Sequence, residues 1–399
     1  MMRALLTGLL FCFATAATAA APAPAESPGF GDALTDVVRD TCNKEVVLLG
    51  EATHGDGATV DFKVRLIERL VDQCGFDAVF FEANHYDFLA FSRKVRLRED
   101  ASADMISSAI GRLWNQDREV APLISFLFTR AKSGRLVVGG LDDQPGSAGA
   151  FYSLDEMPTE LTSLLAEDRR IECRETLRRR ILGDYSDALP YSETERARLR
   201  SCLAESRETV SASPVLDPAT RRERLQMLAS FQRFVARYPF DMTSYIWGRD
   251  LSMYANFRWL AGRLPPRSKI IIWAQNSHVV KDARVTGQYV AGAGNLGAFV
   301  RQAYGARAFA LGFSAASGSF YWGKTEPARR IDPAAPDSLE ARTLARSKAD
   351  SAYLGPGALE RLGEVPGSLF FYKPLRARWS AVVDGIVVFR EQRPPVRAP

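Results

Sequence analysis

The sequence predicts an α/β fold in which a mostly parallel central sheet is flanked by helices and carries a helical insertion or cap. Short apolar runs bounded by turn residues alternate with helical patterns along most of the chain, which is typical of this class. One stretch in the middle shows helical periodicity without strand signals. The chain has 399 residues, of which 46% are hydrophobic and 25% charged, so it is long and apolar enough to bury a full core.

The first residues, 1–19, are expected to be a signal peptide. Arg3 is the only charge before Glu26, an apolar run follows from Ala4 to Ala14, and Ala17-Thr18-Ala19 offers a cleavage site. The apolar run is about half the ~20 residues that a membrane span requires, so an uncleaved anchor is the weaker alternative. We therefore expect a protein secreted or exported to a periplasm, without stable membrane insertion.

An α/β catalytic core is expected over residues 29–150 and 237–393. Its near-continuous apolar runs are typical of parallel strands that helices cover on both faces. A helix over Ala58–Gln73, ended by Gly75, joins the first two strands in one βαβ unit. The expected strands are Glu45–Gly50, Ala78–Phe81, Arg135–Gly140, Lys269–Trp273, Ala306–Phe313, Ser368–Tyr372 and Gly385–Phe389.

Residues 151–236 are expected to form the helical insertion. They are rich in Arg, Glu and Leu with helical spacing, as in Glu160–Ile181 and Ser192–Arg207. Ordinary peripheral helices of the core are the alternative. A further amphipathic helix is expected over Ser244–Gly262.

Four cysteines remain after the signal peptide, and we expect them to form two disulfides. Cys42 precedes the first strand and Cys74 closes the helix after it, so both lie at the same end of the sheet. Cys173 and Cys202 both lie in the later helical segment. We predict the pairs Cys42–Cys74 and Cys173–Cys202, because four unpaired thiols fit an oxidising compartment less well.

Polar residues follow four of the expected strands. The carboxyl ends of parallel strands lie at one edge of a sheet, where ligands bind in open α/β folds. All three histidines of the chain are in these turns. In chain order the turns supply Glu51, Thr53 and His54; Glu82, Asn84 and His85; Asp142, Asp143 and Gln144; and Gln275, Asn276 and His278.

Such a cluster of acids and histidines can activate water. Histidine exchanges a proton near neutral pH, and a neighbouring carboxylate fixes its tautomer. The same groups could instead bind a divalent metal ion. Gly55 and Gly57 permit a tight turn, and the N-terminus of the following helix could help bind an oxyanion, although turn geometry alone also explains both glycines. Arg249 could bind a developing oxyanion, with a salt bridge on its own helix as the alternative.

Other classes are less attractive. The sequence has no G-x-S-x-G motif, so the nucleophile elbow of α/β-hydrolases is absent. It also lacks C-x-x-C or Cys/His zinc spacing. The net charge of +5 is spread along the chain without a basic stripe, so we expect no nucleic-acid partner. Direct attack by water is therefore favoured over a covalent Ser or Cys enzyme.

At this point a family resemblance emerges. Gly50-Glu51-Ala52-Thr53-His54-Gly55, followed by Lys63 and Phe81-Glu82, resembles the opening of the erythromycin esterase family. Trp247-Gly-Arg249-Asp250-x-x-Met253-x-x-Asn256 resembles its Arg-Asp helix, and Trp273-Ala-Gln275-Asn276-Ser277-His278 is similar to its Trp-Ala-His-Asn-x-His strand end. The likeness spans about Glu45 to Phe313. It implies hydrolysis of an ester, typically a macrolide lactone, without a serine nucleophile, on an α/β fold with a helical insertion.

The resemblance also implies residue roles. His54 would be the general base, Glu51 and Glu82 would orient or polarise it, His278 would assist in proton transfer or substrate binding, and Arg249 would stabilise negative charge. Substrate contacts are expected from a further set of residues: Lys63, His85, Asp142, Gln275 and Asn276.

This chain departs from the family pattern twice, at the first His of the His-Asn-x-His element (here Gln275) and at an Arg of many members (here Lys63). Glutamine cannot carry a proton and lysine lacks the planar fork, so both departures argue against a macrolide.

We therefore expect a secreted hydrolase that cleaves a small carboxylic ester or lactone with water activated by histidine and needs no cofactor. One alternative is a metal-dependent hydrolase that uses the same Glu/His cluster. Another is a non-catalytic periplasmic binding protein. The pocket is expected to be lined by the insertion and by the loops 139–149 and 287–297. The oligomeric state leaves no signal in the sequence.

Overall fold

The structure is a computed structural model that describes residues 31–146, 152–237, 242–286, 294–322, 327–345 and 347–397. The expected signal peptide, 1–19, lies outside the described residues, as do parts of the expected pocket loops, 147–149 and 287–293.

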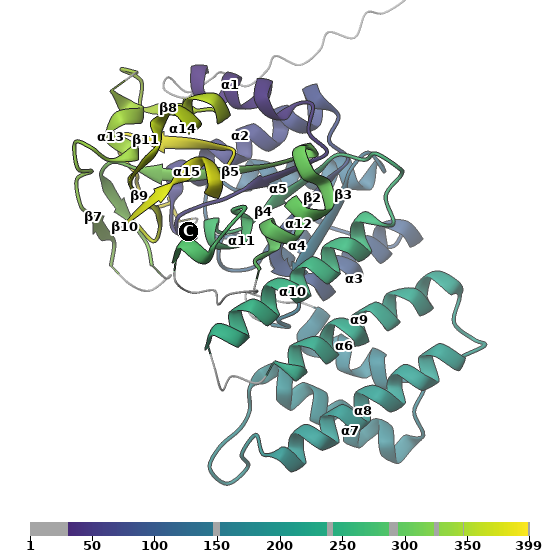
Figure 1. Cartoon of the computed structure of the whole chain (residues 1–399). Helices are drawn as coiled ribbons and strands as arrows, with labels where there is room; N and C mark the ends of the chain where they lie inside the picture. The colour runs from purple at the N-terminus through teal and green to yellow at the C-terminus, as the bar shows by residue number, and fades with distance from the viewer. Residues whose placement is uncertain are drawn as a thin grey trace, which may run out of the picture.

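A seven-stranded central sheet confirms the predicted α/β class (Figure 1). The strand order is β3-β2-β4-β1-β5-β11-β8. In the described part of the chain every neighbouring pair is parallel except the edge pair, where β8 runs antiparallel to β11. The strands are β1 (Val46–Leu49), β2 (Ala78–Asn84), β3 (Val137–Asp142), β4 (Ile270–Trp273), β5 (Ala308–Ala315), β8 (Ser351–Leu354) and β11 (Gly385–Phe389).

Helices cover both faces of the sheet because successive strand residues point to opposite sides. Val47 and Leu49 of β1 pack into one apolar cluster with α1 (Gly31–Thr41), α2 (Gly57–Cys74), α4 (Ala103–Ile110) and α5 (Ala121–Lys132). Val46 and Leu48 pack into a second cluster with α10 (Met242–Ala261) and α12 (Leu296–Tyr304). Helix α3 (His85–Leu97) contributes to both clusters.

Four helices occupy the range of the expected insertion. They are α6 (Tyr152–Thr162), α7 (Glu167–Leu182), α8 (Glu193–Ala212) and α9 (Pro218–Ala236). Figure 1 shows them gathered at one end of the molecule, with α10 between them and the sheet. Their apolar residues join the same cluster as the α10 face of the sheet. The assignment of residues 151–236 as a helical insertion remains a prediction.

The last third of the chain differs in detail from the expected strands. The segment expected at Ser368–Tyr372 ends the strand β9 (Glu364–Phe370), which pairs with β10 (Lys373–Arg378) outside the central sheet. Phe371 and Tyr372 adopt φ values of 56° and 58°, so they form the turn between these strands. The remaining elements are β6 (Gly318–Phe320), β7 (Arg329–Ile331), α11 (Asn276–Val279), α13 (Leu339–Leu344), α14 (Pro356–Leu362), α15 (Trp379–Val382), η1 (Arg284–Thr286) and η2 (Gly305–Arg307).

The structure contains the two predicted disulfides, Cys42–Cys74 and Cys173–Cys202. The first lies at the amino end of β1, where the Lys269 ammonium donates to the carbonyls of Cys42 and Cys74 at 2.8 Å each. The second joins α7 to α8. Among the described residues, no helix combines the length and apolar character that crossing a bilayer requires.

Candidate active site

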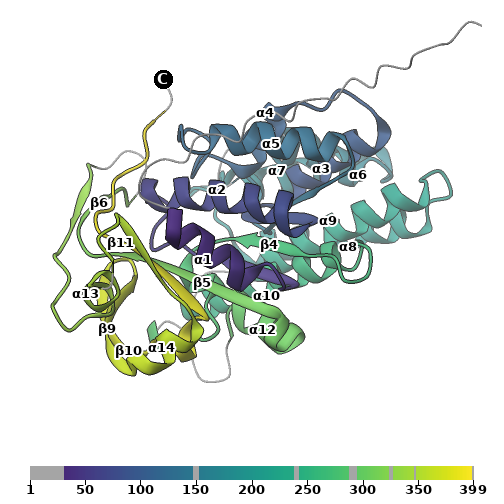
Figure 2. The ribbon, with the colours of Figure 1, turned by 90° about the horizontal axis from the view of Figure 1, so that it is seen from above.

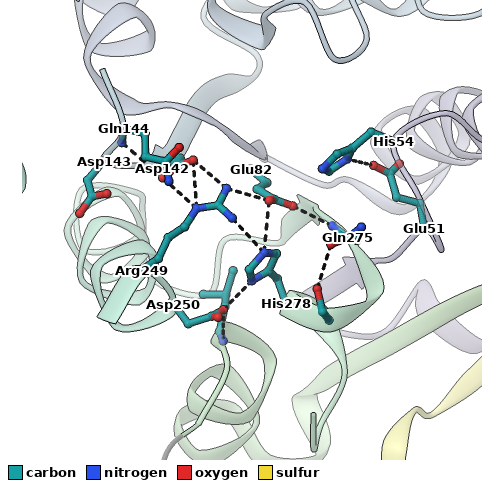
Figure 3. A network of polar contacts seen from close by, with 12 residues as sticks. Glu51, His54, Glu82, Asp142, Asp143, Gln144, Arg249, Asp250, Gln275 and His278 are labelled. Atoms are coloured by element: carbon teal, nitrogen blue, oxygen red, sulfur yellow. Dashed lines mark hydrogen bonds and ion pairs between the residues drawn. The ribbon is translucent and has the colours of Figure 1, made fainter. Parts of the chain in front are cut away.

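The site residues follow four neighbouring strands. In the spatial order β3-β2-β4-β1, the carboxyl ends carry Asp142, Glu82, Gln275 and Glu51, so the parallel register places them along one edge (Figure 3). The predicted convergence of these turns is therefore present in the fold.

Glu51 is fully buried and accepts four hydrogen bonds. Its Oε1 accepts from Nδ1–H of His54 at 2.6 Å and from the indole N–H of Trp114 at 3.2 Å. Its Oε2 accepts from the ammonium of Lys63 at 2.7 Å and from the indole N–H of Trp273 at 3.0 Å. These donors hold the carboxylate in one position, so it can fix the neighbouring imidazole.

His54 combines a fixed Nδ1 with an accessible ring. Its side chain is 23% exposed, and its ring packs edge-to-face on Trp114. Within the described residues, Nε2 has no hydrogen-bond partner. Burial lowers the pKa of His54, but the hydrogen bond to Glu51 and the charge of Glu82 raise it, so that the net pKa lies above the ordinary 6.5. Arg249 opposes this rise.

Lys63 lies beneath Glu51 rather than in contact with solvent. Its ammonium donates to Glu51 and to the Gly50 carbonyl at 3.0 Å, and it lies 3.9 Å from the centre of the Trp273 ring. The side chain is fully buried. Burial lowers the pKa of Lys63 to about 8, although the charge of Glu51 raises it. The structure thus places Lys63 as a support for Glu51 and not at the surface that a substrate would touch.

Arg249 projects from α10 between two carboxylates. It donates to Glu82 Oε1 at 2.8 Å and, through Nη2 and Nε, to Asp142 at 2.8–3.4 Å (Figure 3). Burial lowers the pKa of Arg249, but Asp142 and Glu82 raise it far more. Its side chain is 20% exposed. It is therefore a permanent cation at the accessible edge, and it pairs with carboxylates of β2 and β3 rather than within its own helix, which was the alternative.

His278 is a second cation in the cluster. Its Nδ1–H donates to Asp250 at 2.8 Å and its Nε2 lies 3.2 Å from Glu82 Oε1. Burial lowers the pKa of His278, but the charges of Asp250 and Glu82 raise it to about 10. Both ring nitrogens are thus protonated near neutral pH, and the imidazolium forms an ion pair with Glu82. The contact of Arg249 Nη1 with Nε2 of His278, at 3.2 Å, is then a meeting of two donors.

Glu82 lies between these cations and His54 in the view of Figure 3. Its Oε2 accepts from the backbone N–H of Gln275 at 2.9 Å. Burial raises the pKa of Glu82, but the charges of His278 and Arg249 outweigh burial and hold it well below its ordinary value. Glu82 therefore carries a negative charge that acts on both histidines.

Of three further expected substrate-binding residues, two lie elsewhere or face inward and one is partly exposed. Asn276 is buried and donates to the carbonyls of Phe313 and Leu369, so it braces the strands. His85 is buried against the Gly140 carbonyl and Gln226, away from the cluster, and burial lowers its pKa to about 4. The Gln275 side chain is half-buried and accepts from the Ser277 hydroxyl at 3.0 Å, which leaves it on the accessible side of the cluster.

The N-terminus of α2 is not available to an oxyanion. The Gly57 N–H donates to the Arg393 carbonyl and the Ala58 N–H to Oε1 of Gln392, both at 2.8 Å. The role that the sequence suggested for this helix end is therefore wrong.

Among the described residues, no group of three or more His, Cys, Asp or Glu side chains is arranged to hold a metal ion. Two carboxylates of the cluster, Glu82 and Asp142, both accept hydrogen bonds from the guanidinium of Arg249.

The sequence alone indicates no role for Asp250, Trp114 or Trp273. Asp250 follows Arg249 directly and was visible as an acid, but its partner His278 is on another element. Trp114 lies in a loop without a motif, so only the fold shows that it contacts both Glu51 and His54.

A parallel α/β sheet with an imidazole, paired acids and a guanidinium at its carboxyl edge belongs to the class of sites that can carry out acid–base chemistry. The sequence profile of one family, erythromycin esterase, matches residues 71–382. The chain belongs to the erythromycin esterase family, and this confirms the resemblance in its sequence. It also agrees with the expected enzyme class, an ester-cleaving hydrolase.

The chain is also similar to a relative in sequence and to three solved structures in fold. The chain is 22% identical over 296 residues to the Bacillus subtilis (strain 168) protein YbfO, provisionally described as a hydrolase; the match covers 69% of this chain and 66% of YbfO, just under two thirds. A Bacillus cereus protein is 17% identical with a TM-score of 0.65, and a succinoglycan biosynthesis protein is 16% identical with a TM-score of 0.69, each over 92% of this chain and 93% of the other.

A mutant of the erythromycin esterase EreC in its open conformation is 15% identical with a TM-score of 0.65, over 92% of this chain and 95% of that one. At these identities the three solved structures establish a shared fold only.

Proposed function

We propose that this protein hydrolyses a carboxylic ester or lactone of a small molecule with a water molecule that His54 activates. The observation that carries the proposal is the state of His54. Its Nδ1–H is held by a buried carboxylate, its Nε2 is unpaired within the described residues, and its side chain is accessible at the same edge as Arg249. This is the arrangement that a general base requires.

In the first step, Nε2 of His54 takes a proton from a water molecule while the water oxygen attacks the ester carbonyl. Glu51 stabilises the resulting imidazolium through the Nδ1–H bond, and Glu82 adds a second negative charge nearby. Lys63, Trp114 and Trp273 keep Glu51 in place as the charge develops.

The carbonyl oxygen becomes an oxyanion, and Arg249 is the group that we propose stabilises it. Its Nη1 faces the protonated ring of His278 and has no other acceptor among the described residues, so its N–H groups are available to a substrate oxygen. His278 acts as a fixed cation that keeps Nη1 unpaired, and its high pKa makes it unsuited to the role of base.

In the second step, the tetrahedral intermediate collapses. The C–O bond to the leaving group breaks, and Nε2–H of His54 returns its proton to the departing alkoxide. Ester and water become acid and alcohol, and His54 is again neutral. No covalent intermediate with the protein is required, which agrees with the missing nucleophile elbow.

The substrate class is a small ester or lactone. Erythromycin is in the family's name and in that of EreC, and we do not extend it to this chain. Lys63 is buried, so its replacement of an arginine alters the support of Glu51 and not a substrate contact. Gln275 is on the accessible side and carries the argument for a substrate other than a macrolide.

We also propose that the protein is exported after cleavage of residues 1–19, which the two disulfides support. Residues 29–150 and 237–393 would then form the catalytic core, and 151–236 an insertion that lines one side of the pocket.

The test is turnover of a panel of aryl esters, lactones and macrolides by the mature protein and by His54→Ala. We expect the substitution to lower kcat by about 10²–10⁴-fold, the usual contribution of a general base. The unfolding temperature of the variant checks that the fold is intact. Unchanged turnover in a folded His54→Ala would overturn the proposal.

Two other outcomes would favour the alternatives. Activity that disappears on chelation and returns with one divalent ion would favour a metal-dependent hydrolase with the same Glu/His cluster. Tight binding of a lactone without turnover would favour a binding protein.

A further inference from the structure

We propose that the C-terminal segment (residues 391–397), and Gln392 in particular, positions His54 for the reaction. The inference rests on the proposed function of His54. The family match ends at residue 382, so this segment lies beyond it. Figure 2 shows the yellow C-terminal end of the chain passing β6 and the N-terminal end of α2.

The first contact is at the start of α2. This helix directly follows the turn that carries His54, and its N-cap residue, Asp56, makes no capping hydrogen bond to it. Helix N-termini leave backbone N–H groups that need acceptors. Here the C-terminal segment supplies them, because the Arg393 carbonyl accepts from Gly57 and Oε1 of Gln392 accepts from Ala58.

Gln392 is a buried hub whose polar atoms are all in use. Besides its bond to Ala58, its Nε2 donates to the Thr59 hydroxyl at 2.9 Å and to the Tyr372 hydroxyl at 3.3 Å. Its backbone N–H donates to Ser317 and its carbonyl accepts from Ser319, both at 2.9 Å. The side chain is therefore held rigidly and transmits the position of the segment to α2.

A second path leads from Gln392 into the His54 turn. Burial raises the pKa of Asp56 to about 7, and the Tyr372 hydroxyl, which accepts from Gln392, is one of the groups that act on this carboxyl and lower its pKa. Asp56 in turn accepts from the backbone N–H of Thr53 at 2.9 Å and from its hydroxyl at 2.7 Å. These two bonds close a four-residue turn with His54 inside it. Since Asp56 uses its oxygens to close this turn, the cap of α2 has to come from elsewhere.

The C-terminal segment also contacts the loop that carries Trp114, the residue on which the His54 ring packs. The Arg118 N–H donates to the Val396 carbonyl at 2.8 Å, and the Arg397 guanidinium pairs with Asp117. The N–H of Asp117 donates to the carbonyl of Trp114 at 2.9 Å, and Trp114 packs on His54 and binds Glu51.

Close packing leaves little freedom at these contacts. A Cβ at Gly57 would lie 2.7 Å from the backbone of Pro394, and a Cβ at Gly55 would lie 2.1 Å from the Tyr321 carbonyl oxygen. Glycine at both positions, which the sequence explains by turn geometry, lets the backbone of the turn pack directly against the backbone of neighbouring segments. A shift of the segment therefore moves the turn. Displacing a reacting group by about 1 Å can cost about 100-fold in rate.

The experiment compares two variants with two matched controls. Gln392→Ala removes the hub, and Tyr372→Phe removes one hydroxyl on the path to Asp56. Gln226→Ala removes another buried glutamine, which binds Asn256 and His85 on the far side of the sheet. Tyr353→Phe removes a tyrosine hydroxyl near a different aspartate, since Tyr353 donates to Asp40 at 3.0 Å.

Two readouts are measured on the full mature chain. One is kcat and KM on the best ester of the panel. The other is the pKa of His54 by NMR, which does not depend on turnover. The chain has three histidines, and because the pKa values are about 4 for His85 and about 10 for His278, the remaining titration belongs to His54, whose pKa is raised above 6.5. The charged groups that face His54 are Glu51, Glu82 and Arg249, and neither variant removes any of them.

We expect both variants to lower kcat by about 10-fold or more, with KM changed less than about 2-fold. We also expect the pKa of His54 to fall toward its ordinary 6.5, because a loosened turn weakens the bond to Glu51. Both controls should keep the parent values.

The inference is overturned if the folded variants keep the parent kcat and the parent pKa of His54, or if the controls lose as much. If Gln392→Ala does not fold, Tyr372→Phe decides alone. If the parent cleaves no ester, the proposed function fails, and the pKa of His54 still tests whether the segment positions the imidazole.

Discussion

Replacing Glu51 by glutamine should separate the stability of the site from its chemistry. The carboxylate is fully buried and is the charged partner of the Lys63 ammonium at 2.7 Å. In Glu51→Gln the amide oxygen has to face Lys63, because an N–H₂ group there would meet an ammonium. Breaking a buried pair by removing one partner costs about 3–5 kcal/mol, and we expect this loss in guanidinium unfolding.

The same rotamer presents the amide N–H₂ to Nδ1 of His54. The imidazole then has to accept at Nδ1 and carry its proton on Nε2, where it cannot take a proton from water. A wrong tautomer of this kind lowers kcat by about 10²–10⁴-fold. We expect kcat to fall by that amount while the variant still folds.

A second substitution sharpens the test. Lys63→Met removes the buried cation that Glu51→Gln strands, so the double variant should recover at least half of the lost stability. It should remain slow, because a neutral amide cannot support the imidazolium. The reasoning is wrong if the double variant is as unstable as Glu51→Gln, or if either variant retains the parent kcat.

Three further outcomes are expected. First, the pH profile of kcat/KM should be bell-shaped. Because His54 acts only when neutral and its pKa is raised, kcat/KM should fall on the acid side with a midpoint above pH 6.5, and it should fall again on the alkaline side as Lys63 loses its proton near pH 8. A flat profile from pH 6 to 9 would contradict this. Second, the pKa of His85 is about 4 in the folded protein and near 6.5 in the unfolded chain. The free energy of unfolding should therefore have the full contribution of His85 above pH 6.5 and fall by about 3 kcal/mol as the pH drops to 4. In denaturant unfolding, His85→Gln should lose less stability over this range. Third, replacing Cys42 and Cys74 by alanine opens a loop of sequence separation 32 and should lower the free energy of unfolding by about 4 kcal/mol. The kcat should not change, since this disulfide is at the opposite edge of the sheet from His54. A fall in kcat in the folded variant would show that the two edges are coupled.

The elements that the sequence predicts best are those with a local signal. Each of the four strands that carry the site is a short apolar run that ends in acids or histidines, so its existence and its polar end are visible in a few residues. The antiparallel edge strand Ser351–Leu354 has no such signal. It is four residues long and gains its place only by pairing with β11.

Side-chain roles were predictable only where they do not depend on distant partners. Lysine is rarely buried, so a substrate contact was expected of Lys63, and only its contacts with Glu51 and Trp273 explain its position inside. Asn276 reads as a site residue because it lies between Gln275 and His278. Its amide turns inward because the absent Cβ of Gly50 leaves room for it: a Cβ there would lie 1.9 Å from its Oδ1.

The strand order has a consequence for how the molecule is made. β1 and β2 follow each other in the chain but are not neighbours, because β4 lies between them. While residues 85–269 are being synthesised, the place of β4 in the sheet is therefore empty. Until β4 is made, β1 and β2 each have an unpaired backbone edge on that side. Such edges invite association with other chains, so newly made protein should need shielding until β4 inserts. Since Gln275 and His278 follow that same strand, the site proposed for hydrolysis cannot be complete until β4 has taken its place in the sheet.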